Sequence, residues 1–149
     1  MAYTDVRDYI EELTRRNLLH VIEDEISKDT ELVPLVRLQF RGLPEPERKA
    51  FWFKNVTDAR GVDYDGSVLL GSLGSSRVIY GAALGVGPDE IAQKWASTHG
   101  NHLPPEPVGA ENAPVKQVVL KAPNMGKGAD TFPHLVSTPG FDPAPFITA

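Results

Sequence analysis

Two histidines in the segment His99-Gly100-Asn101-His102 have the clearest potential for metal chemistry. Imidazoles three residues apart can share a zinc ion, but a zinc site also needs a third protein ligand and often a fourth. The nearest carboxylates, Glu106 and Glu111, follow in a proline-rich stretch. We therefore interpret the two histidines as exposed loop residues, and we predict no metal ligand in this sequence.

A glycine-rich segment, residues 71–77, lies between a predicted strand and a predicted helix. Backbone N–H groups at such a junction can hold an anion. The segment lacks the Lys-Ser/Thr pair of a phosphate-binding P-loop and the G-x-G-x-x-G spacing of dinucleotide sites. We interpret it as a structural turn. The small apolar run 81–87 is interpreted as close packing at a helix end rather than as a nucleotide site.

The other two histidines have no catalytic partners close in the sequence. His20 lies in a predicted strand and His134 in a loop that contains proline. A catalytic triad needs a nucleophile and an orienting acid around the imidazole. Neighbours in space stay open at this point, so no catalytic residue is predicted.

Acidic and aromatic side chains also have ordinary structural explanations. Asp24, Glu25 and Glu31 lie at the end of a strand and the start of a helix, where the helix dipole favours negative charge. Trp52 and Trp95 are interpreted as core or interface residues, and a role in stacking on a cofactor stays open.

The composition narrows the class of protein. The chain has 149 residues, enough for one domain or for one domain and part of another. A net charge of −5 argues against a nucleic-acid partner, and the absence of cysteine excludes thiolate chemistry. No apolar run approaches the ~20 residues of a membrane span. The acidic N-terminus is unlike a signal peptide. We expect a cytoplasmic protein without a membrane partner.

Hydrophobic spacing up to about residue 98 predicts an α/β domain of alternating helices and strands. Thr4 or Asp5 is expected to cap the first helix, which ends near Asn17, and Asp29 or Thr30 is expected to cap the second. The second helix is expected to bury Leu32, Leu35, Val36 and Phe40. The predicted strands cover residues 19–26, 50–56 and 68–73, and the later helices cover residues 31–41, 76–84 and 89–96.

The C-terminal part of the sequence has a different character. Nine of the 13 prolines lie between Pro104 and Pro145. One strand is predicted at residues 115–120, and residues 146–149 look like the start of another. Because an unpaired strand exposes its backbone polar groups, we expect residues 113–149 to need a partner. That partner is either the rest of the same polypeptide or a second chain.

The order of these segments resembles the N-terminal part of UbiD-type decarboxylases. Residues 51–56 are similar to the family's L-L-F-x-N-V strand, and residues 68–77 are similar to its V-L-G-N-L-F-G-S-R turn. Residues 5–19 resemble its opening helix and strand, although Asn17-Leu18-Leu19 replaces a glycine-containing turn. Residues 146–149 resemble its P-Y-I-T-A/W-G segment.

The resemblance implies two regions. Residues 1–112 would form the family's N-terminal α/β domain. Residues 113–149 would start the central split β-barrel domain that binds prenylated FMN, which is incomplete in this chain.

Members of the family are much longer, and they use prenylated FMN, Mn²⁺ and K⁺ to decarboxylate or carboxylate aromatic or α,β-unsaturated carboxylic acids. The family's metal ligands and its Glu-Arg-Glu set have no counterpart in residues 1–149. The resemblance carries over one cofactor-binding residue, Thr148, whose hydroxyl could donate to a flavin oxygen.

Two functional hypotheses follow from the resemblance. In the first, the chain is the N-terminal part or a subunit of an oligomeric prenylated-FMN-dependent decarboxylase. It supports the cofactor domain and is not competent alone. In the second, it is a non-catalytic interaction or regulatory module with the same fold. The substrate and the direction of the reaction stay open.

Overall fold

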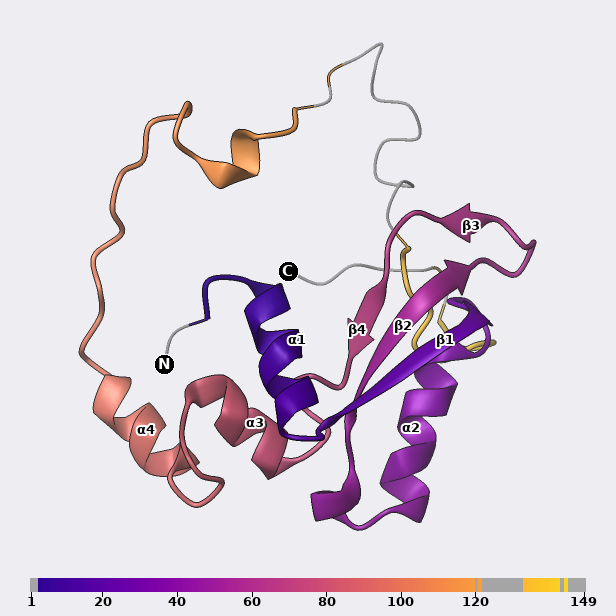
Figure 1. The fold of residues 1–149 in the computed structure, drawn as a ribbon, viewed down its shortest axis with the longest axis horizontal. Coiled ribbons are helices and arrows are strands. Elements are labelled where there is room, and N and C mark those ends of the chain that lie inside the picture. The colour runs from indigo at the N-terminus through magenta and orange to yellow at the C-terminus, as the bar shows by residue number, and fades with distance from the viewer. Residues whose placement is uncertain (1–2, 120, 122–132, 143, 145–149) are drawn as a thin grey trace.

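The computed structural model describes residues 3–119, 121, 133–142 and 144. Its main body is a small sheet with helices on both faces (Figure 1). The elements are α1 (Val6–Arg15), β1 (Leu19–Ser27), α2 (Leu32–Gly42), β2 (Ala50–Thr57), β3 (Asp63–Tyr64), β4 (Val68–Leu70), α3 (Arg77–Leu84) and α4 (Ile91–Thr98), with short 3₁₀ turns at Glu45–Glu47 and Pro114–Lys116.

β2 is the central strand of the sheet. It pairs in parallel with β1, starting at Leu19 opposite Ala50, and the register shifts at a bulge between Ile22 and Glu25. β4 and β3 pair antiparallel with the first and second halves of β2. Because β1 and β2 are parallel, the chain between them must cross over the sheet, and α2 makes that crossover.

Each face of the sheet carries its own buried cluster. α2 covers one face, while α1 and α3 cover part of the other (Figure 1). The α1/α3 cluster consists of Tyr9, Leu13, Ala50, Ile79 and Ala82. The α2 cluster consists of Ile26, Leu32, Val36, Phe53 and Val56.

Local signals place both ends of α1 as the sequence predicted, and a side-chain cap also starts α3. The Asp5 side chain accepts a hydrogen bond from the backbone N–H of Arg7 at 2.6 Å and caps α1. Asn17 has a positive φ of 57° just after that helix, a conformation that asparagine tolerates better than most residues. Ser76 caps α3 by accepting from the N–H of Ile79 at 3.3 Å.

The second helix differs from the prediction in its cap and in its buried face. Glu31 is the N-cap, and no side chain makes a capping hydrogen bond there, so the prediction of Asp29 or Thr30 was wrong. Phe40 is 44% exposed, whereas Gln39 is only 5% exposed. The helix therefore turns a polar residue inward, because Gln39 finds hydrogen-bond partners inside the fold.

The strand predicted at residues 115–120 is also wrong for the residues described. Pro114–Lys116 form a 3₁₀ turn, and Val115 and Val118 are 82% and 73% exposed. A strand needs a neighbour for its backbone groups, and no described residue pairs with this segment. Leu120 and the strand predicted at residues 146–149 lie outside the described residues.

Residues 133–142 lie against α2. The Arg37 guanidinium donates to the backbone oxygen of Ser137 at 3.2 Å and to the Thr138 hydroxyl at 3.0 Å. Leu135 packs on the α2 cluster. None of the described helices has the length and apolar character needed to cross a bilayer.

Candidate functional site at the carboxyl end of the parallel strands

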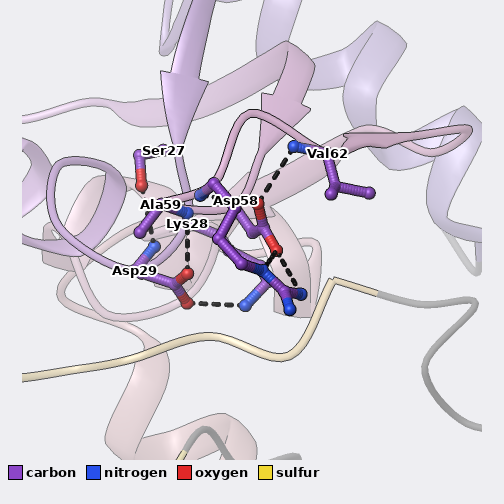
Figure 2. Close-up of polar contacts among 7 residues, drawn as sticks. Ser27, Lys28, Asp29, Asp58, Ala59 and Val62 are labelled. Carbon is purple, nitrogen blue, oxygen red and sulfur yellow. Dashed lines mark hydrogen bonds and ion pairs between the residues drawn. The ribbon is translucent and has the colours of Figure 1, made fainter.

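Charged side chains gather where the two parallel strands end (Figure 2). Lys28 and Asp29 directly follow β1, and Asp58 directly follows β2. In sheets with parallel strands, ligands bind preferentially beyond the carboxyl ends of those strands. This edge is therefore the candidate functional site in the described part of the chain.

Lys28 and Asp29 form a partly buried ion pair. Lys28 is only 5% exposed, its Nζ lies 2.6 Å from Asp29 Oδ1, and the same ammonium lies 5.7 Å from the centre of the Tyr64 ring. The other oxygen of Asp29, Oδ2, accepts from the N–H of Ala59 at 2.9 Å. The Asp29 carboxylate thus joins the end of β1 to the turn that follows β2.

Both oxygens of Asp58 are also occupied. Oδ1 accepts from the backbone N–H groups of Arg60 and Val62 at 2.8 and 3.0 Å. Oδ2 accepts from Arg60 Nε and Nη2 at 2.9 and 2.7 Å. Two hydrogen bonds, the larger effect from the Val62 N–H and the next from the Arg60 side chain, lower the pKa of Asp58 to about 2. A carboxylate that stays ionised and fully bonded at neutral pH is a poor general acid or base, so this cluster holds two loops together.

Replacing Asp58 with asparagine is expected to destabilise the fold in a pH-dependent way. The folded-state pKa lies below the unfolded-state value of about 3.9. The stabilisation by the charge is therefore present above that value and is lost as the pH falls toward about 2. Urea unfolding of the natural protein and of Asp58→Asn should give free energies that differ near neutral pH and converge in acid.

The matched control for this test is Asp65→Asn, because Asp65 is exposed in the same connection and makes no ion pair with the described residues. Its effect should be small at every pH. A difference between Asp58→Asn and the natural protein that stays constant across the acid range would contradict the assigned role of the charge.

The glycine-rich turn before α3 is structural, as predicted. The N–H of Arg77 donates to Glu45 Oε1 at 2.7 Å, and the N–H of Ile79 donates to Ser76. An anion at this helix start would have to displace a carboxylate. Gly71 has φ +68°, and a Cβ there would lie 2.2 Å from Ser75 Oγ, so the tight turn requires glycine.

The predicted close packing around Gly81 is confirmed as well. A Cβ on Gly81 would lie 2.7 Å from the backbone oxygen of Val86, which belongs to the turn that ends α3. The φ of +69° at Gly85 places that residue at the C-cap of the helix. Residues 81–87 thus pack backbone against backbone at the end of α3.

The four histidines lie in different surroundings, and none is hydrogen-bonded to a carboxylate of a described residue. His99 and His102 are exposed, as predicted, and no group of three or more potential metal ligands occurs among the described residues. The His20 ring lies 5.2 Å from the Phe51 ring, and burial, with a smaller effect from Lys49, lowers its pKa. His134 Nε2 is buried without a hydrogen-bond partner among the described residues.

The two tryptophans differ in exposure. Trp52 is partly buried, donates to Ser67 Oγ at 2.9 Å, and has Lys54 Nζ 3.2 Å from its ring centre. Trp95 is 55% exposed and donates to the Tyr80 hydroxyl at 3.0 Å. Of the two interpretations made from the sequence, Trp95 fits an interface rather than a core.

The acidic residues singled out from the sequence, Asp24, Glu25 and Glu31, are not members of the Lys28, Asp29 and Asp58 cluster. Asp24 and Glu25 are exposed on β1, and Glu31 Oε2 accepts from the N–H of Ser27 at 2.9 Å. Thr148 lies outside the described residues. The cluster of Lys28, Asp29 and Asp58 was missed from the sequence. The available signal was a charged residue directly after each of two parallel strands.

The fold is that of an α/β domain that also occurs as part of larger decarboxylase chains. The structures that match include those of vanillic acid decarboxylase from Sedimentibacter hydroxybenzoicus (ShVdcCD). Its open form with truncated ShVdcD matches with a TM-score of 0.61 and 20% identity over 81% of this chain and 25% of that chain. Its closed form matches with a TM-score of 0.60 and 21% identity over 79% of this chain and 24% of that chain.

The chain thus spans about a quarter of the length of the decarboxylase chains that it matches. No protein-family model matches the sequence, and no curated protein sequence does. The resemblance to the N-terminal portion of a UbiD-type decarboxylase is confirmed at the level of the fold.

Proposed function

We propose that this chain is the N-terminal part of a prenylated-FMN-dependent decarboxylase of the UbiD type, present either as a segment of a longer polypeptide or as one subunit. The observation that carries the proposal is the fold match, in which most of this chain corresponds to a quarter of a decarboxylase chain. Because one fold can host many different functions, surface features of the chain must also support its role.

Apolar side chains of the later segments support an architectural role. Leu103, Val115 and Val118 are 93%, 82% and 73% exposed. They lie in residues 99–119, the segment that leads away from α4 and contains the short 3₁₀ turn (Figure 1). Apolar side chains left this exposed to water gain stability when a partner covers them. We assign them to the contact with the cofactor-binding part of the enzyme, which this domain supports.

We assign no metal ligand to the described residues. They contain no group of three or more potential metal ligands, and the Asp29 and Asp58 carboxylates at the carboxyl edge of the sheet already accept hydrogen bonds. We therefore assign no step of the reaction to them. The proposal places prenylated FMN, Mn²⁺ and K⁺ mainly on residues outside this chain, with Thr148 as the one contribution from it.

The proposed substrates are aromatic or α,β-unsaturated carboxylic acids, and the proposed particle is an oligomer. The double substitution Val115→Asp and Val118→Asp in that particle tests the assignment. It should weaken the association by about tenfold or more, because burying an unpaired carboxylate at an interface is costly. Size-exclusion chromatography with flavin absorbance measures assembly, and carbon dioxide release measures activity.

The matched control is Gln117→Asp, which places one carboxylate on an exposed polar position between the two valines. It should leave assembly intact. Thermal unfolding of the body at residues 3–98 should be the same in all variants. If both valines can be replaced without loss of assembly, they make no contact with the cofactor-binding part. A natural particle without flavin would favour the non-catalytic module instead.

A further inference from the structure

The arginines of this chain divide into two groups. Five of the eight form ion pairs with carboxylates, whereas the three on α2 and in the connection after it have no carboxylate within 4.0 Å among the described residues. The paired residues are Arg7, Arg15, Arg16, Arg60 and Arg77, and the other three are Arg37, Arg41 and Arg48. Two of these three arginines, Arg37 and Arg41, lie one helical turn apart on α2.

A groove runs along the outer side of the same helix. It has a volume of about 480 Å³ and an apolar floor that includes Pro34 and Leu38. Leu38 is 58% exposed. Positions 34, 38 and 41 follow helical spacing, so Arg41 continues the row formed by the two apolar residues. The full lining is Glu31, Pro34, Leu35, Arg37, Leu38, Arg41, Thr138 and Pro139.

Thr138 and Pro139 form the wall of the groove opposite α2, and hydrogen bonds hold this segment in place. Arg37 donates to Ser137 O and Thr138 Oγ1, and the N–H of Thr138 donates to Asp142 Oδ2 at 2.6 Å. The nearby carboxylates of Asp142 and Glu31 each accept from a backbone N–H. Arg41 lines the groove, and no described residue accepts a hydrogen bond from its guanidinium.

We propose that this groove docks an acidic amphipathic segment of a partner protein. The partner would place an apolar side chain on Pro34 and Leu38 and a carboxylate on Arg41. Guanidinium groups recognise carboxylates through paired hydrogen bonds. The apolar floor and the neighbouring arginines match a segment that carries leucine-type and acidic side chains. A nucleic acid is a poorer match, because the chain is acidic overall and would repel its phosphates. The proposal does not depend on the decarboxylase assignment.

Fluorescence anisotropy with a labelled amphipathic peptide tests the proposal. The probe is a peptide of about 15 residues, long enough to form a helix, with leucines on one face and glutamates on the other. A second peptide has lysines in place of the glutamates. The glutamate peptide should bind and the lysine peptide should not. Arg41→Glu should weaken the binding by about tenfold or more, because it opposes like charges. Leu38→Ser should also weaken it.

The matched control is Lys94→Glu, which makes the same change in net charge on α4, on the opposite side of the domain from α2 (Figure 1). It should leave the affinity unchanged. Equal effects of Arg41→Glu and Lys94→Glu, or equal binding of the two peptides, would overturn the proposal. Sedimentation analysis that finds a dimer lost in Arg41→Glu would also overturn it, since the groove would then join two copies of this chain. Because Leu38 and Arg41 are exposed, circular dichroism should find every variant folded.

Discussion

Replacing Phe53 with alanine is expected to lower the free energy of unfolding by about 3–5 kcal/mol, the range measured for large-to-small changes in a packed core. Phe53 is fully buried in the middle of the central strand, and its ring centre lies 5.9 Å from that of Phe51. It packs within the cluster that α2 makes with the sheet. Truncation would leave a cavity that the surrounding helix and strands can only partly fill.

Phe40→Ala is the matched control for this prediction. The same atoms are removed, but Phe40 is 44% exposed and contacts the Arg48 guanidinium at 5.0 Å from its ring centre. Its loss should cost less than about 1 kcal/mol. Urea denaturation followed by circular dichroism measures both. Similar losses for the two variants would mean that α2 is rotated on the sheet relative to the structure described above.

Replacing Gln39 with alanine is expected to cost about 2–3 kcal/mol, because each of its hydrogen bonds contributes about 1 kcal/mol and its partners would lose them. Gln39 Nε2 donates to Lys49 O and to Ser75 Oγ, both at 3.1 Å, and Oε1 accepts from the N–H of Lys49 at 2.9 Å. One side chain thus joins α2 to the start of β2 and to the glycine-rich turn.

Two comparisons show whether the loss of stability comes from the Gln39 hydrogen bonds or from a change in helix propensity. Gln93→Ala, on the exposed surface of α4, should change stability little. In a double-mutant cycle, Gln39→Ala and Ser75→Ala should not be additive, since they share a hydrogen bond. Strict additivity in urea denaturation, or equal effects of Gln39→Ala and Gln93→Ala, would show that the network does not stabilise the fold.

Features that depend on neighbours in the chain were predictable. The Asp5 and Ser76 caps, the turn at Asn17 and the tight backbone at Gly71 each depend on a few adjacent residues. Side-chain capping, tolerance of positive φ and helical spacing are local properties. Most helices and strands in residues 5–98 followed from them, whereas the two-residue strand β3 was not predicted.

Features that depend on distant residues were not predictable. The strand expected at residues 115–120 needs a neighbouring strand, and the described residues supply none. Asp29 was expected to cap a helix, but it bonds to Lys28 and to the N–H of Ala59, thirty positions along the chain. Parallel pairing of β1 with β2 brings these groups together.

The sequence by itself determined that this is an α/β domain and where most of its helices and strands lie, because hydrophobic spacing and capping act over a few residues. Only the tertiary structure decided that Gln39 rather than Phe40 is buried, because that choice depends on hydrogen-bond partners at Lys49 and Ser75. It alone also decided that the Asp29 carboxylate meets the N–H of Ala59, since the parallel pairing of β1 with β2 brings the ends of these two strands together.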